Sequence, residues 1–166
     1  MLPYDPDGVQ KNIFAIRLTN GSNDNMAVDG SDTSVEFEIA PPSDEIWRVA
    51  SWTLYIEDQK GFNITSYGAN GALTNGMLIQ GTFGGVTSNM LSYPIKTNGN
   101  IAATTNDVKL FTFGNDNDVL TAKWDFTSSG QFVRLDGSQG DKLTVVVRDD
   151  MTFLSKQHIL ANGYKE

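Results

Sequence analysis

Apolar and polar residues alternate along most of this chain, and this period of two limits the fold more than any other feature. Between residues 34 and 39, Val35, Phe37 and Ile39 alternate with a serine and two glutamates. Such alternation is typical of a β-strand with one face buried and the other in water. The same pattern or a short apolar run predicts further strands at residues 12–18, 46–57, 77–83, 108–113, 119–126, 132–135, 143–148 and 153–160.

Turn signals separate these segments. Asn-Gly or Asp-Gly pairs occur at residues 20–21, 29–30, 75–76, 98–99 and 136–137, and they tolerate the positive φ of tight turns. No long stretch has the 3.6-residue period of a helix, and we expect an ordered loop or a short helical turn at residues 59–73. The sequence therefore predicts a single-domain, all-β protein, an antiparallel β-sandwich of the jelly-roll type.

Composition narrows the functions that such a fold can have. The 166 residues include no cysteine, which excludes thiol nucleophiles, disulfides and cysteine-based zinc sites. The formal charge is −8. Because nucleic acids and anionic membranes bind through clustered Lys and Arg, we expect neither as a partner. We also expect no membrane-spanning helix and, from the first residues, no secretion signal.

Few residues combine in a way that indicates catalysis. His158 is the single histidine, so any Ser-His-Asp triad would depend on it, and no G-x-S-x-G motif accompanies it. Asp149 and Asp150 are adjacent, but neighbours on a strand point to opposite faces, which makes them a poor acid–base pair. The glycine-rich run at residues 81–85 lacks the Lys and the helix of a phosphate loop, and it is interpreted as a turn. We predict no catalytic residue, no cofactor and no enzyme activity.

Two oxygen-rich loops resemble the beginning of a calcium site. In the run at residues 114–118, asparagine and aspartate alternate, yet the Gly and Glu that a calcium loop requires later are absent. The second loop joins Asn23, Asp24 and Asn25 to Asp29 and Asp32. Both are interpreted as polar turns, and no metal site is predicted, although a cation at a subunit contact stays open as an alternative.

The longest predicted strand, residues 46–57, carries bulky residues at odd and even positions. Such a strand is central in a sheet, or its second face is covered by another chain. Trp52 is assigned to the core side, like Trp124 on its own strand. Trp47, Val49 and Tyr55 occupy the other parity and are predicted, with Tyr4, to contact a neighbouring subunit.

Residues 26–58 also resemble small structural proteins of tailed bacteriophages. The shared features are a Val28-Asp-Gly-Ser31 loop, an alternating strand, the Pro41-Pro42 turn, and an aromatic-rich strand that ends in Ile56-Glu-Asp58. The resemblance extends over residues 12–100. It implies a virion component that is built on a β-sandwich and forms symmetric assemblies, and it implies no catalytic residue.

These observations favour an accessory structural protein of a tailed-phage virion, which decorates the capsid or joins head to tail. Residues 1–10 would form an N-terminal arm laid on a neighbour, and residues 11–166 the sandwich. Its partners would be other virion proteins and further copies of itself, and assembly would take place in the bacterial cytoplasm. A carbohydrate- or receptor-binding module is the alternative, which needs exposed aromatic residues beside an Asn/Asp loop.

Overall fold

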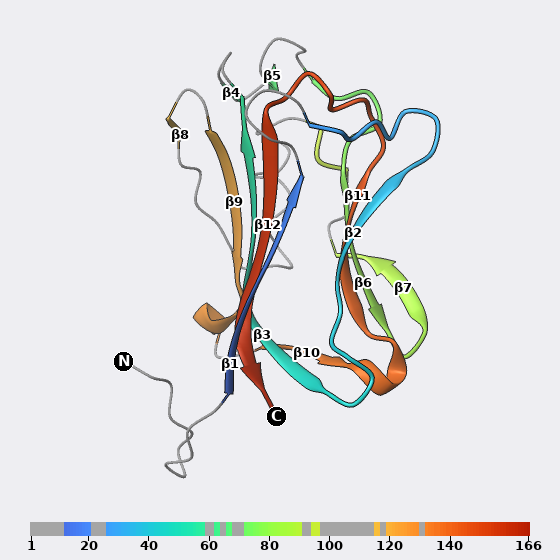
Figure 1. Cartoon of the computed structure of the whole chain (residues 1–166), viewed down its shortest axis with the longest axis vertical. Helices are drawn as coiled ribbons and strands as arrows, with labels where there is room; N and C mark the ends of the chain where they lie inside the picture. The colour runs from blue at the N-terminus through green and yellow to red at the C-terminus, as the bar shows by residue number, and fades with distance from the viewer. Residues whose placement is uncertain are drawn as a thin grey trace.

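The chain folds into two antiparallel sheets that face each other (Figure 1). The computed structural model describes residues 12–20, 26–58, 62–63, 66–67, 72–90, 94–96, 115–116, 119–129 and 132–166. Within them, regular structure consists of β-strands and two short 3-10 turns, η2 (Phe126–Ser129) and η3 (Gly137–Gln139). The prediction of an all-β sandwich is confirmed.

The larger sheet contains six of the described strands. Its order is β1 (Asn12–Asn20), β12 (Lys156–Lys165), β3 (Ile46–Glu57), β9 (Val119–Asp125) and β8 (Asn115–Asp116). Strand β10 (Val133–Asp136) pairs with the first residues of β3, beyond the end of β9. Strand β3 therefore has a neighbour on both sides, which confirms its predicted central position.

The smaller sheet has the order β2 (Val35–Ile39), β11 (Lys142–Val147), β6 (Leu78–Phe83) and β7 (Val86–Asn89). Strands β4 (Phe62–Asn63) and β5 (Ser66–Tyr67) pair with each other, where the sequence predicts a loop or a helical turn. Several connections pass from one sheet to the other, which is compatible with a jelly roll. Residues 91–93 and 97–114 lie outside the described ones, and the jelly-roll assignment stays a prediction.

Most predicted strands are found near their expected positions, and the differences have local causes. The strand predicted at residues 153–160 begins only at Lys156, because Asp150 accepts hydrogen bonds from Thr152 and ends the preceding segment in a turn. Strand β7 has no counterpart among the predicted strands. The strand predicted at residues 108–113 and the predicted arm at residues 1–10 lie outside the described residues.

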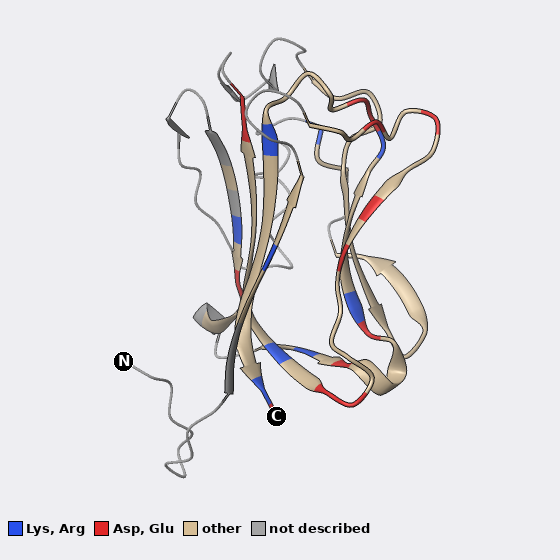
Figure 2. Cartoon of the chain, viewed as in Figure 1, with Lys and Arg blue, Asp and Glu red and all other residues tan. Residues whose placement is uncertain are grey.

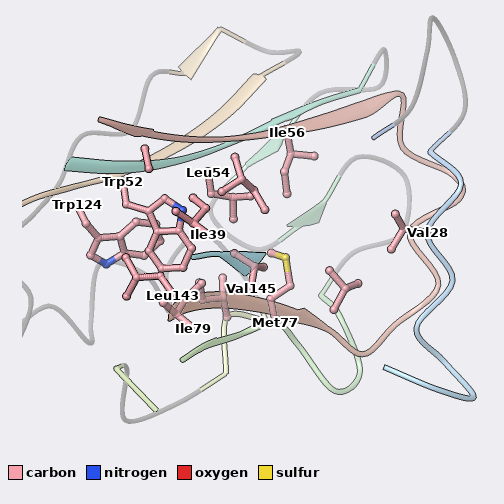
Figure 3. Close-up of a cluster of buried hydrophobic side chains, with 14 of the residues drawn as sticks. Val28, Ile39, Trp52, Leu54, Ile56, Met77, Ile79, Trp124, Leu143 and Val145 are labelled. Atoms are coloured by element: carbon pink, nitrogen blue, oxygen red, sulfur yellow. The ribbon is translucent and has the colours of Figure 1, made fainter. Parts of the chain in front are cut away.

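The core lies between the two sheets, and its largest members are tryptophans (Figure 3). Trp52 and Trp124 are 0% and 2% exposed, with ring centroids 5.5 Å apart. Leu143 and Val145 of β11 and Ile79 of β6 close the core from the smaller sheet. The assignment of both tryptophans to the core is confirmed, which removes them from any exposed sugar-stacking platform.

A β-bulge explains why β3 carries bulky residues at both parities. From Trp47 to Ser51 the odd-numbered residues are buried, whereas from Trp52 to Ile56 the even-numbered ones are buried. At the changeover Ser51 pairs with Asn162 and Val49 pairs with Gly163, so that Ala50 is an extra residue. An inserted residue shifts the side-chain alternation by one position. Both halves of β3 therefore contribute to the core of the same chain.

Candidate interaction site

His158 lies on the outer face of the larger sheet, enclosed by neighbours that do not suit a catalytic triad. The Nη2 atom of Arg17 lies 2.8 Å from His158 Nε2, and Thr19 Oγ1 lies 2.9 Å from Nδ1. The ring of Tyr55 stacks on the imidazole, with centroids 5.5 Å apart. Burial lowers the pKa of His158 below its ordinary value, and the positive charges of Arg17 and Lys156 act in the same direction. These contacts do not include a carboxylate that would orient the imidazole as the base of a triad.

Asp149 and Asp150 each hold a turn of this chain. The Asp149 carboxylate is buried and accepts hydrogen bonds from the backbone N–H groups of Asn75 (2.9 Å) and Gly76 (2.7 Å). Asp150 accepts from the Thr152 N–H (2.9 Å) and hydroxyl (2.6 Å). The adjacent cleft, about 400 Å³ in volume, is lined by both aspartates and by Leu73 and Phe153. Each carboxylate therefore accepts hydrogen bonds from its own chain at the wall of this cleft.

The calcium-like loops are described only in part. In the run at residues 114–118, the structure describes the backbone of Asn115 and Asp116, which forms β8. Residues 23–25 of the second loop lie outside the described residues. Asp29 accepts a hydrogen bond from the Ser31 hydroxyl (2.5 Å), which lowers the pKa of that carboxyl. Among the residues that the structure describes, no group of three or more acidic or histidine side chains is placed to hold a metal ion.

The predicted interface residues that the structure describes fall in two different environments. Val49 and Trp47 are 0% and 5% exposed and belong to the core of their own chain, because the bulge turns both toward it. The Trp47 indole N–H also donates to Glu45 Oε2 at 2.5 Å. Tyr55 is half-buried against His158, and Tyr4 lies outside the described residues. The interpretation that β3 offers Trp47 and Val49 to a neighbour is therefore corrected.

Exposed apolar side chains gather instead on the hairpin of β6 and β7. Phe83 and Val86 flank its Gly84-Gly85 turn and are 39% and 69% exposed. Both glycines have positive φ, +56° and +82°, as a two-residue hairpin turn requires, which confirms the predicted turn at residues 81–85. The other large exposed apolar side chains, Phe132 and Leu160, lie on the larger sheet or beside it.

A buried carboxylate fixes this hairpin to the rest of the smaller sheet. Asp141, just before β11, is 6% exposed and accepts a hydrogen bond from the Gly84 N–H at 2.7 Å. Its second oxygen accepts from the Asp136 N–H at 3.0 Å. Within the hairpin, Thr82 and Thr87 hydroxyls lie 2.8 Å apart, and the Gln80 amide donates to Asn89 at 3.0 Å. The exposed hairpin is thus held at its turn and along its length.

The outer edge of β7 presents unpaired backbone groups. Met90 N donates to Ile79 O at 2.8 Å, and antiparallel pairs alternate between bonded and non-bonded, so Ser88 and Val86 also face β6. The N–H and C=O groups of Thr87 and Asn89 therefore point away from the sheet. In the part of the chain that the structure describes, no strand or loop pairs with them. All four side chains of β7 are exposed.

Charged residues are absent from the chain segment that forms this hairpin. No Asp, Glu, Lys or Arg occurs between Lys60 and Lys96, although the chain carries a net charge of −8. Strands β6 and β7 are tan along their whole length in Figure 2, whereas the opposite edge of the sheet, β2, carries acidic residues. Edge strands usually carry charges that block pairing with another chain. This long uncharged stretch is the sequence signal that identifies the hairpin, and the apolar–polar alternation does not reveal it.

No protein-family model and no curated protein matches this chain. Among solved structures, it is similar to a chain in the crystal structure of an Aeromonas sobria serine protease in complex with its chaperone. The identity is 15% and the TM-score 0.28, and the match covers 98% of this chain and 28% of the other. At this TM-score the likeness carries no argument about fold or function. No helix of the described residues has the length and apolar character to span a membrane.

Proposed function

We propose that this chain is an accessory structural protein of a tailed-phage virion, which packs against other protein subunits to decorate a capsid or to join head to tail. The observation that carries the proposal is the β6–β7 hairpin, which combines exposed Phe83 and Val86 with an uncharged edge that no other described strand pairs with. Exposed apolar residues on an unguarded strand edge favour contact with protein rather than with water. The similarity of residues 26–58 to phage structural proteins supports the same role.

The ionisable groups of the described residues support a structural role as well. Asp141 and Asp149 hold turns, Glu45 accepts from Trp47 and Lys165, and Glu38 pairs with Lys142. Each of these groups has a structural partner within the chain. A protein whose described polar groups maintain its own shape, and whose apolar exposure is concentrated on one hairpin, is suited to packing.

The proposal is tested with phage particles that lack this protein. Purified chain is mixed with them, and the bound fraction is measured after sedimentation. We expect the wild-type chain to bind and Val86→Lys to lose at least tenfold in affinity, since a charge buried in an apolar contact is strongly unfavourable. Leu160→Lys adds the same charge at an exposed apolar residue of the larger sheet and is the matched control, with unchanged binding.

Two results would contradict this proposal, the first its function and the second its contact surface. One is a wild-type chain that binds neither capsids nor necks that lack it. The other is equal binding by the Val86→Lys and Leu160→Lys variants, which would show that the hairpin is not the contact.

A further inference from the structure

We infer that β7 pairs with β7 of a second copy of this chain, in an antiparallel arrangement about a two-fold axis at Ser88. This inference deepens the proposed function, on which it rests, because it names the partner of the hairpin as the same protein. It follows from three observations: the direction of the free backbone groups, the order of side chains along the strand, and the distribution of charge.

The free backbone groups of β7 fit a two-fold arrangement. Thr87 and Asn89 both point their N–H and C=O groups away from β6, as the ladder alternation requires. With Ser88 on the axis, Thr87 of each copy lies opposite Asn89 of the other. Each such pair exchanges two N–H···O bonds, so that the contact satisfies all the outward groups of both residues. The two smaller sheets then form one continuous sheet across the two copies.

The side chains of β7 form a sequence that is equivalent in both directions. Val86 and Ser88 of β7 share one face with Met90, which directly follows the strand and is half-buried against the core, and this gives the order apolar, small polar, apolar. Thr87 and Asn89 share the other face, and both are hydrogen-bonding residues. In the two-fold arrangement Val86 lies opposite Met90, Ser88 opposite Ser88, and Thr87 opposite Asn89. Each side chain therefore meets one of similar character, which makes the contact self-complementary about the two-fold axis.

Charge separates this edge from the opposite edge of the same sheet. Two copies that each carry a net charge of −8 repel one another, and this repulsion is weakest when they meet at a surface without charged residues. Strand β2 has exposed Glu36 and Glu38, so that self-pairing there would bring carboxylates together. Strand β7 has no charged residue, and neither has the rest of the β6–β7 hairpin. The uncharged edge is the one at which a second copy is accommodated.

The first test removes the outward N–H while it leaves the hairpin intact. Thr87→Pro eliminates a donor that points away from β6, and proline is accepted on edge strands when its N–H is not needed. Thr87→Ala is the control, because it also loses the hydroxyl contact to Thr82 but keeps the N–H. Sedimentation of the chain alone, over a wide concentration range, should show a wild-type dimer. We expect Thr87→Pro to weaken the dimer about thirtyfold relative to Thr87→Ala.

The second test depends on Ser88 of one copy lying opposite Ser88 of the other. Ser88→Lys and Ser88→Glu each place two like charges together, and we expect each variant to weaken its dimer about fivefold. An equimolar mixture should recover the dimer, because lysine then faces glutamate. The thermal midpoints are compared at a concentration where wild type and variants are all monomeric, and equal midpoints there show that the fold is retained.

The outcomes are decisive in both directions. A wild-type chain that stays monomeric at all concentrations, equal dimerisation of Thr87→Pro and Thr87→Ala, or a mixture that does not recover overturns the pairing. These measurements contain no phage particle, so a chain that dimerises through β7 but binds no particle would reject the proposed function and leave the pairing intact. A chain that stays monomeric but binds particles would reject the pairing and support the proposed function.

Discussion

The glycines of this sandwich are tightly packed in one region and open to solvent in another. At the packed corner, where β10 and the end of β12 meet the start of β3, a Cβ on Gly163 would lie 2.0 Å from Arg48 O, and one on Gly137 would lie 1.8 Å from Pro42 O. At the β6–β7 turn, a Cβ on Gly84 or Gly85 would have nothing within 4 Å. The corner is closed by its own backbone, and the hairpin is open to solvent. The corner therefore maintains the fold, whereas the hairpin turn has room to contact a partner.

The largest difference in stability between the two regions is expected when a methyl group is added to a glycine in each. Gly163→Ala should lower the free energy of unfolding by about 3 kcal/mol, because backbone at the bulge has to move away. Gly84→Ala should cost only about 1 kcal/mol, the penalty for an L-residue at positive φ without any steric contact. Denaturant titration of both variants checks the difference. Equal losses would show that the corner is not more tightly packed than the hairpin.

A smaller effect is expected from the link between the two regions. Asp141→Asn replaces one of two buried acceptors by a donor that faces a backbone N–H, either of Gly84 or of Asp136. We expect a loss of about 2 kcal/mol of stability and a weaker dimer, because the hairpin is no longer fixed at its turn. Asp44→Asn, at an exposed position, is the control and should change stability by less than about 0.5 kcal/mol. If Asp141→Asn behaves like this control, the carboxylate does not position the hairpin.

The smallest effect is a dependence on pH that arises far from the hairpin. The pKa of His158 is lowered in the folded chain, first by burial and then by Arg17 and Lys156, while Glu57 acts in the opposite direction. The unfolded chain therefore binds more protons below about pH 6.5, and stability falls as the pH decreases through that range. The slope contributed by His158 is at most about 1.4 kcal/mol per pH unit.

His158→Gln should remove this slope between pH 7 and pH 5.5 and leave the acid unfolding caused by carboxylates at lower pH. Urea titrations of the wild type and the variant at each pH give the difference directly. Dimerisation through β7 should be unaffected, because His158 lies on the other sheet. A variant with the same slope as the wild type would show that His158 does not titrate as described.

The sequence predicted the sheets better than it predicted the surface. The bounds of β3, residues 46–57, follow from composition and alternation, and the structure confirms them. The bulge at Ala50 is not predicted from the sequence. A strand whose buried positions change from odd to even has bulky residues at both, and so does a strand with two apolar faces. That ambiguity led to the assignment of Trp47 and Val49 to an interface. Only the register of β3 against β12 resolves it.

Strand β7 was missed for a different reason. Val86, Thr87, Ser88 and Asn89 include one apolar residue, and no alternation distinguishes them from a loop. They form a strand because β6 precedes them and the Gly84-Gly85 turn directs the chain back along it. The end of β12 is similar, since Asn162 and Gly163 indicate a turn locally but lie within a strand. In both places tertiary pairing determines the local structure.

Amide hydrogen exchange, followed residue by residue at low and high protein concentration, tests most directly whether the edge of β7 is a protein contact. We expect the Thr87 and Asn89 amides to exchange more slowly as the protein concentration rises. Val86 and Ser88, whose amides already face β6, and the charged edge β2 should show little change. Exchange at Thr87 and Asn89 that does not depend on concentration, or equal slowing along β2 and β7, would contradict this expectation.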